Sequence, residues 1–133
     1  MIRSRLVCLI FVFVITLSVP SAANEVILSY NSDITIDVDA TMLVRESIKV
    51  RAEGASIQRG IYRDFPTTYR DPQGNRYVTG FDFIGATRDG KQEPWHIGTM
   101  DNGVRVYLGS EHVRLDSGEY TYVIEYRTSR QLG

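Results

Sequence analysis

Apolar and polar residues alternate with a period of two along most of this chain, and that period constrains the fold more than any other feature. The run at residues 33–38 is the clearest case. One of its faces carries Ile34, Ile36 and Val38. The pattern predicts a half-buried β-strand. A second alternating run, at 44–52, follows the turn-forming residues 39–41, so the two runs predict a β-hairpin.

Three further alternating runs, at 77–86, 104–108 and 120–128, are separated by Asp- and Gly-containing turn signals. Beyond the N-terminus no window has the period of a helix. About seven short strands with turns at roughly ten- to fifteen-residue intervals predict an all-β fold, an antiparallel β-sandwich. An immunoglobulin-like topology is the first interpretation, and a small β-barrel is the alternative. The Cys, Trp and Cys spacing of antibody domains is absent, so only the architecture is predicted.

The N-terminus has the features of a secretory signal. Arg3 and Arg5 precede an apolar or small run at 6–19, and small residues around Ala23 suit cleavage there. The run would span only about 21 Å as a helix, which is short of the roughly 30 Å hydrocarbon core. We therefore predict a signal helix at 1–23 and an extracytoplasmic β-domain at 24–133, with an uncleaved anchor as the alternative.

The remaining composition excludes several classes of protein. The single cysteine of the chain, Cys8, leaves with the signal, so a disulfide framework is excluded and an apolar core must supply the stability. A chain of this size suffices for one self-standing fold. Without the two signal arginines the formal net charge falls from -1 to -3. A mildly acidic surface argues against nucleic acid as a partner.

One residue violates the alternation of the second strand. Glu46 falls in register with Val44 and Ile48, so a regular strand would bury its carboxylate, at a cost of several kcal/mol without a partner. Arginine can meet a carboxylate with two parallel hydrogen bonds. We expect an ion pair between Glu46 and Arg63 or Arg59 that holds the neighbouring segment to the sheet. The alternative is a bulge that turns Glu46 toward solvent.

Residues 59–66 follow neither the helix nor the strand period, and they combine two arginines, a carboxylate, two aromatic rings and a proline. Such a composition in an irregular segment is typical of a binding surface. The candidate surface residues are Arg59, Tyr62, Arg63, Phe65, Tyr69 and Trp95. In the alternative interpretation, Phe65 plugs the open end of the sandwich and the arginines only add solubility.

Few residues suit catalysis. The mature chain has two histidines, His96 and His112, and no Gly-x-Ser-x-Gly nucleophile motif, so we predict no metal site, no cofactor and no enzymatic activity. A binding module for a protein or an envelope glycan is the favoured interpretation. The alternatives are an envelope enzyme that acts on glycan or peptide through Asp64, Asp82 or Glu46, and a structural spacer.

The order of several motifs resembles a known bacterial family. The motifs are Asp39-Ala40-Thr41 before Val44-Arg45-Glu46-Ser47-Ile48, then Gly60-Ile61-Tyr62-Arg63-Asp64-Phe65-Pro66, then residues 119–126 leading to Arg130-Gln131-Leu132-Gly133. Over essentially all of 24–133 the chain resembles the N-terminal part of the predicted membrane proteins that contain domain of unknown function 2207.

The resemblance implies an extracytoplasmic β-domain that is followed, in full-length members, by transmembrane helices. The partner could then be the membrane-embedded remainder of the same chain, and membrane association would come from segments downstream of Gly133. By the same resemblance the chain is expected to break off inside a longer β-region. A sheet that lacks a strand would expose an edge and favour aggregation.

Overall fold

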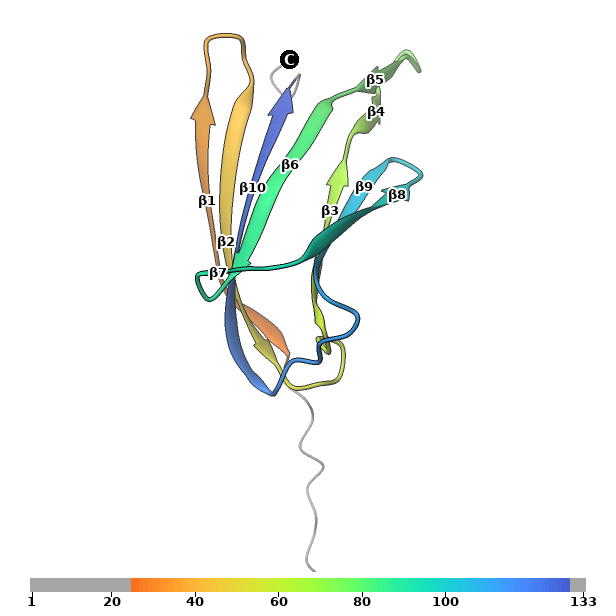
Figure 1. The fold of residues 1–133 in the computed structure, drawn as a ribbon. Helices are drawn as coiled ribbons and strands as arrows, with labels where there is room; N and C mark the ends of the chain where they lie inside the picture. Colours follow the sequence, from red (N-terminus) through yellow and green to blue (C-terminus); the bar gives the residue numbers. More distant parts are fainter. Residues whose placement is uncertain (1–24, 130–133) are drawn as a thin grey trace, which may run out of the picture.

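The computed structural model describes residues 25–129. The predicted signal at 1–23 and the motif at 130–133 lie outside the described residues. The described part contains ten strands and no helix, hence none long and apolar enough to span a membrane (Figure 1). The strands are β1 (Val26–Ile36), β2 (Met42–Ala52), β3 (Gly60–Pro66), β4 (Thr68–Arg70), β5 (Arg76–Val78), β6 (Gly80–Arg88), β7 (Lys91–Gln92), β8 (Trp95–Met100), β9 (Gly103–Gly109) and β10 (Gly118–Ser129).

The strands form two main antiparallel sheets that pack face to face, which confirms the predicted sandwich. The large sheet has the order β1-β2-β10-β6-β7, and the small sheet has the order β3-β9-β8. Strands β4 and β5 form a separate hairpin. Within residues 25–129 the large sheet keeps two separate edges, β1 and β7, so it does not close into the alternative small barrel. Figure 1 shows the sheets diverging toward the end that carries the β1–β2 hairpin.

The strand order departs from the immunoglobulin arrangement. In an immunoglobulin domain the last two strands lie in the sheet opposite the first two. Here the last strand, β10, lies between β2 and β6 in the large sheet. The cause is an uninterrupted antiparallel pairing of β10 with the whole of β2, from Gly118 opposite Ala52 to Thr128 opposite Met42.

The core lies between the two sheets and confirms the predicted faces of the second strand. On β2 the inward residues Val44, Ile48 and Val50 are buried, as is Glu46 in the same register, while the outward positions are more exposed. Burial of each such side chain contributes about 1.5–3 kcal/mol. The other large contributors are Tyr122, Ile124 and Tyr126 on β10, Phe83 on β6, and Phe65, Val106 and Leu108 in the small sheet.

The first strand is not half-buried as predicted. β1 extends over Val26–Ile36 and is exposed along its whole length, and Val38 lies beyond its end. The predicted β-hairpin does form, with Ile34 opposite Val44 and Ile36 opposite Met42. The difference from the prediction is that no described strand of the small sheet packs over β1. The small sheet has three strands against five and does not extend over β1.

The segment at 59–66 was predicted to be irregular, and the structure corrects this. Residues 60–66 form the regular strand β3, which pairs with β9 from Gly60 opposite Gly109 to Pro66 opposite Gly103. The alternation is concealed because the middle of its three inward residues, Arg63, is charged. Trp95, predicted to lie at a strand end in or beside an irregular segment, is the first residue of strand β8.

Candidate functional site

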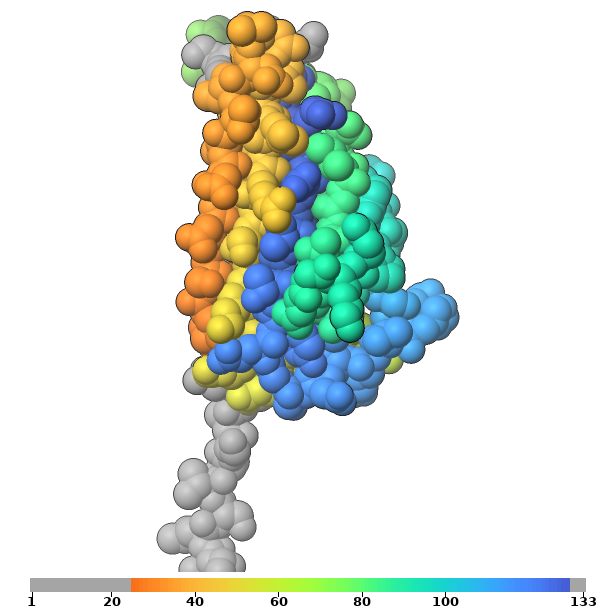
Figure 2. Space-filling model, turned by 60° about the vertical axis from the view of Figure 1, so that its left-hand side comes forward, coloured from red at the N-terminus to blue at the C-terminus, as the bar shows by residue number. Residues whose placement is uncertain are grey.

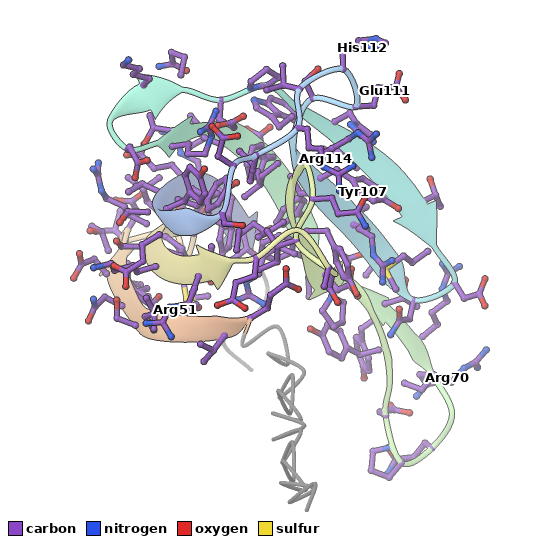
Figure 3. The ribbon with its side chains drawn as sticks, turned by 90° about the horizontal axis from the view of Figure 1, so that it is seen from below. Arg51, Arg70, Tyr107, Glu111, His112 and Arg114 are labelled. Atoms are coloured by element: carbon purple, nitrogen blue, oxygen red, sulfur yellow. The ribbon has the colours of Figure 1, made fainter. Side chains whose placement is uncertain are left out.

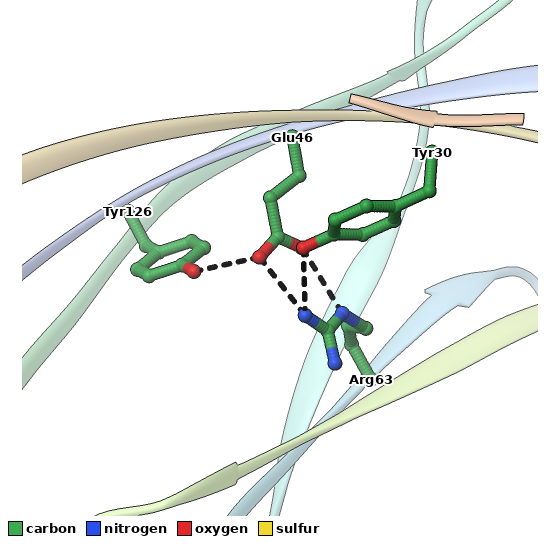
Figure 4. A network of polar contacts seen from close by, with 4 residues as sticks. All are labelled: Tyr30, Glu46, Arg63 and Tyr126. Carbon is green, nitrogen blue, oxygen red and sulfur yellow. Dashed lines mark hydrogen bonds and ion pairs between the residues drawn. The ribbon is translucent and has the colours of Figure 1, made fainter. Parts of the chain in front are cut away.

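Glu46 lies at the centre of a buried polar network that joins the two sheets (Figure 4). Its side chain is only 3% exposed. Arg63 donates from Nε to Oε2 at 3.0 Å and from Nη2 to Oε1 at 2.9 Å. The Tyr126 hydroxyl donates to Oε1 at 2.8 Å, and Arg63 Nη2 also donates to the Tyr30 hydroxyl at 3.1 Å. Arg63, and not Arg59, is therefore the partner of Glu46.

The network favours the charged forms of both partners. Burial raises the pKa of Glu46, but Arg63 and the hydroxyls of Tyr30 and Tyr126 outweigh it, so this pKa lies below its usual value. The hydrogen bonds to Glu46 raise the pKa of Arg63 in turn. Burial, reinforced by the Glu46 carboxylate, raises the pKa of Tyr126, which keeps its hydroxyl protonated as a donor. The network thus fixes β3 above β2 through a charged pair.

The inner face of β1 is mainly apolar, yet among the described strands only β3 reaches it, through the contact of Arg63 with Tyr30. Tyr30 lies opposite buried Ile48 and Ile34 opposite buried Val44, so both side chains point to the inside of the sandwich. Ile34 is nevertheless 55% exposed and Tyr30 47% exposed. The inward side chains exposed in this way are Ile27, Tyr30, Ile34 and Ile36. Viewed from below, the small sheet runs away from β1 (Figure 3).

Two unpaired strand edges lie on this same side. Among the described strands β1 borders only β2, and β3 borders only β9. Arg63 contacts Glu46 on β2 and Phe65 contacts Tyr126 on β10, so β3 lies over β2 and β10. The space over β1 is therefore next to the free edge of β3. A cleft of about 310 Å³ opens here between the sheets. Its walls include Ile34, Met42, Phe65, Tyr69 and Phe81. We call the inner face of β1 together with this cleft the open side.

The outer faces of the two sheets differ in character. Between β2 and β10 the outer face of the large sheet carries a ladder of exposed ion pairs, as expected of a solvated surface. Arg45 meets Glu125 at 2.7 Å, and Lys49 meets Glu119 at 3.0 Å. Figure 2 shows the side of the molecule on which β1, β2, β10 and β6 lie in a row. The small sheet instead presents aromatic rings on its outer face.

Tyr62, Tyr107 and His96 lie side by side across the three strands of the small sheet, in one row of the register. The His96 and Tyr107 rings are stacked, with centroids 4.5 Å apart and planes 11° apart. The Tyr62 and Tyr107 centroids are 6.3 Å apart. Tyr62 remains 56% exposed. We call these three residues the aromatic face.

Two contacts fix the rings of this face. The Arg105 guanidinium lies 4.0 Å from the centre of the Tyr62 ring and holds Asp64 through bonds of 2.6 and 2.8 Å. The Tyr107 ring lies against Gly98, where a β-carbon would be 3.2 Å from it. The hydrogen bonds from Arg105 lower the pKa of Asp64. Asp64 is thus a structural carboxylate that supports the aromatic face.

A pocket of about 340 Å³ adjoins one end of the aromatic face. Its walls include Ser56, Gln58, Arg59, Ser110 and Glu111 besides the three rings. Tyr107 and Glu111 are marked in Figure 3. The pocket therefore combines flat apolar rings with hydroxyl, amide and charged groups that can both donate and accept hydrogen bonds.

The six predicted surface residues do not form one surface. Tyr62 and Arg59 belong to the aromatic face and its pocket. Phe65 is buried, and Tyr69 lines the cleft and donates its hydroxyl to the Pro66 carbonyl at 2.8 Å. The Trp95 ring packs edge-on against the Phe83 ring, with the two ring centroids 4.6 Å apart.

The sequence patterns did not single out Tyr107 and Arg105, and they indicated His96 to be a surface or packing residue and not a base or metal ligand. The sequence does indicate that residues 105 and 107 face outward, because residues 104, 106 and 108 of the same strand are apolar and face inward. Which outward residues become neighbours, however, follows from the register between strands. Among residues 25–129 no cluster of three or more His, Cys, Asp or Glu side chains is placed to hold a metal ion.

Glu25 lies in a cradle of backbone N–H groups formed by the loop after β2. Its carboxylate accepts hydrogen bonds from Glu53 at 3.1 Å, Ala55 at 3.0 Å, Ser56 at 2.6 Å and Ile57 at 3.1 Å. Desolvation opposes ionisation, but these four N–H donors outweigh it and lower the pKa of Glu25 to about 2. The carboxylate thus ties the start of β1 to the loop that borders the pocket.

Replacement of Glu25 with glutamine is expected to lower the melting temperature at neutral pH and to leave it unchanged near pH 2. The folded-state pKa lies below the ordinary value of 4.5, so the stabilisation is complete above that value and is lost as the pH falls toward about 2. Thermal unfolding of both proteins between pH 7 and pH 2 measures this difference. The exposed Glu111→Gln variant is the control. A Glu25→Gln difference that does not depend on pH would contradict the carboxylate cradle.

Comparisons with known proteins agree with the motifs of the sequence. The profile of the predicted membrane protein (DUF2207) N-terminal domain matches residues 26–133. The uncharacterized protein YciQ of Escherichia coli strain K12 is 31% identical in an alignment 132 residues long, and that alignment covers 94% of this chain. The chain spans about a fifth of the length of that relative, 21%. Because the profile covers nearly the whole chain, the protein belongs to the family of predicted membrane proteins with a DUF2207 N-terminal domain.

Proposed function

We propose that this domain is a non-catalytic, extracytoplasmic interaction module whose open side accepts an extended polypeptide strand. The observation that carries the proposal is the inner face of β1, where Ile27, Ile34 and Ile36 point inward and are more than half exposed, and where β3 reaches only Tyr30, through Arg63. Exposed apolar surface of this kind marks an interaction site. The membrane-protein family and the predicted signal support an extracytoplasmic setting.

The shape of the open side favours a strand over other occupants. The position above β1 is bordered by the free edge of β3, which offers backbone N–H and C=O groups for pairing. A strand added there would satisfy this edge and cover β1 at the same time, as in β-strand addition. The inward residues of the added strand would contact Ile34 and Ile36 toward one end of β1 and Tyr30 toward the other, with Ser32 between them. The occupant is therefore an extended segment with apolar side chains at alternate positions.

The states of the acidic residues favour binding over catalysis. Glu46 and Asp64, two of the three acids that an envelope enzyme could use, are each held by an arginine, and the pKa of each is lowered. A general acid requires a carboxyl group that keeps its proton near neutral pH. These two carboxylates serve as structural anchors, which supports an interaction role.

Alkylation of single cysteines tests whether the open side is covered. In a Cys8→Ser background, Ile34→Cys places a thiol on the inner face of β1, and Thr35→Cys places one on its outer face. In the purified chain both thiols should react readily with a maleimide. In intact cells that export the protein, the thiol at position 34 should react at least about tenfold more slowly than the thiol at position 35. Equal rates in cells would overturn the proposal.

A further inference from the structure

We propose that the strand accepted by the open side carries a neutral polar residue, such as serine, threonine or asparagine, next to Arg63 and between apolar residues on the same face. This inference rests on the proposed function and names the side chain that the site selects. The feature that carries it is the Arg63 guanidinium, which extends from β3 across to β1. Its Cζ atom lies 5.3 Å from the centre of the Phe65 ring on β3 and 5.6 Å from that of the Tyr30 ring on β1.

One nitrogen of this guanidinium has no partner within the described part of the chain. Nε and Nη2 donate to Glu46, and Nη2 also donates to the Tyr30 hydroxyl. Nη1 makes no hydrogen bond among residues 25–129, and it points away from Glu46 (Figure 4). The Arg63 side chain is 34% exposed, so water can reach the guanidinium. A strand laid along the free edge of β3 would displace that water, and the Nη1 donors would then need an acceptor on the strand.

The register of the sandwich locates the neighbour of Arg63 on an added strand. A residue directly beside Arg63 would have its β-carbon roughly 4.5–5.5 Å away and would point to the same inner face. Across the space between the sheets it would face Ser32 of β1, which pairs with Glu46 of β2. The next inward residue of the strand would lie among apolar side chains, where Phe65 and Ile34 line the same cleft. The position next to Arg63 is therefore a polar point in a mainly apolar strip.

The charge balance at this point favours a neutral residue over an acidic or an apolar one. Glu46 already neutralises Arg63, so a second buried carboxylate would carry an uncompensated charge. An apolar residue would leave the Nη1 donors without a partner once water is excluded, which weakens binding. A hydroxyl or amide oxygen can accept from Nη1 without adding charge. The same residue would fix the register, because a slip of the strand would place an apolar side chain beside Arg63.

Binding of matched peptides to the purified protein tests the inference. Two fluorescein-labelled peptides have valine at every inward position and lysine at every outward position, except that the central inward residue is threonine in one and valine in the other. Threonine and valine have nearly the same shape, so the pair isolates the hydroxyl group. By fluorescence anisotropy we expect the threonine peptide to bind about tenfold more tightly, because it satisfies a donor that the valine peptide buries. A third peptide, with aspartate at the centre, should also bind more weakly than the threonine peptide.

Variants of the protein locate the effect. The double variant Glu46→Leu/Arg63→Leu, which removes the buried pair, should lose the preference for threonine or reverse it. Ile34→Lys should weaken binding of all three peptides at least about tenfold, whereas Thr35→Lys, on the outer face of β1, should leave it unchanged. Circular dichroism checks that each variant is folded. If the double variant does not fold, the comparison of the peptides on the natural protein decides the question.

The possible failures separate this inference from the proposed function. Equal binding of the threonine and valine peptides, tightest binding of the aspartate peptide, or an unchanged preference in the folded double variant would each overturn the inference and leave the strand site standing. If no peptide bound at millimolar concentration, or if Ile34→Lys had no effect, the strand site itself would be contradicted, and the inference with it.

Discussion

Replacement of Arg63 with leucine is expected to lower the free energy of unfolding by about 3–5 kcal/mol, because it leaves the buried carboxylate of Glu46 without its cation. Glu46 has a side-chain exposure of 3% and accepts both guanidinium bonds. Equilibrium unfolding in urea near pH 7 measures the change. The leucine variant should also shift the pKa of Glu46 upward, since burial alone raises it.

Two comparisons make this result specific to the buried pair. The double variant Glu46→Leu/Arg63→Leu should recover much of the loss, because it removes both charges from the interior. Arg45→Leu, which breaks the exposed pair with Glu125, should cost about 0–1 kcal/mol. The Arg63 contribution is complete above the ordinary glutamate pKa of 4.5 and is lost as the pH falls below it. If Arg63→Leu lowered the free energy of unfolding no more than Arg45→Leu does, the buried pair of Glu46 and Arg63 would not be needed for stability.

Replacement of Gly60 with alanine is expected to destabilise the small sheet by about 3 kcal/mol or more, at the upper end of overpacking effects. A β-carbon at Gly60 would lie 1.7 Å from the Leu108 carbonyl oxygen, so β3 could not keep its distance from β9. The register of these strands sends Arg63 inward and Tyr62 outward. A change in that register therefore affects both the buried pair and the aromatic face.

The control for Gly60→Ala is Gly85→Ala on β6, where a β-carbon would meet no atom within 4 Å. Gly85→Ala should unfold within about 0.5 kcal/mol of the natural protein. Urea unfolding of both variants, followed by tyrosine fluorescence, measures the difference. If Gly60→Ala were as stable as Gly85→Ala, the close approach of β3 and β9 would be refuted.

The alternation of β2 could be read from the sequence because it depends on local geometry. A strand turns successive side chains to opposite faces, so Val44 and Ile48 were assigned to the core without knowledge of their neighbours. The same rule identified Glu46 as an inward carboxylate that needs a partner. The choice between Arg63 and Arg59 stayed open, because it depends on how β3 lies over the large sheet.

The properties that depend on the lateral position of the sheets could not be predicted. β1 has an alternating pattern like that of β2, yet it is exposed because the small sheet ends before it. Residues 60–66 seemed irregular because the inward arginine of β3 meets a carboxylate from a distant strand. The aromatic face likewise arises from the pairing of three strands, in which Tyr62, Tyr107 and His96 become neighbours.

Amide hydrogen exchange along β3 tests most directly whether a polypeptide strand completes the sandwich. In the purified chain, the amides of β3 that point away from β9 should exchange fast, since β3 has no other described neighbour. In membranes prepared from cells that export the protein, these same amides should become protected. Fast exchange of these amides in both states would contradict strand addition, even if the thiol at position 34 were shielded there.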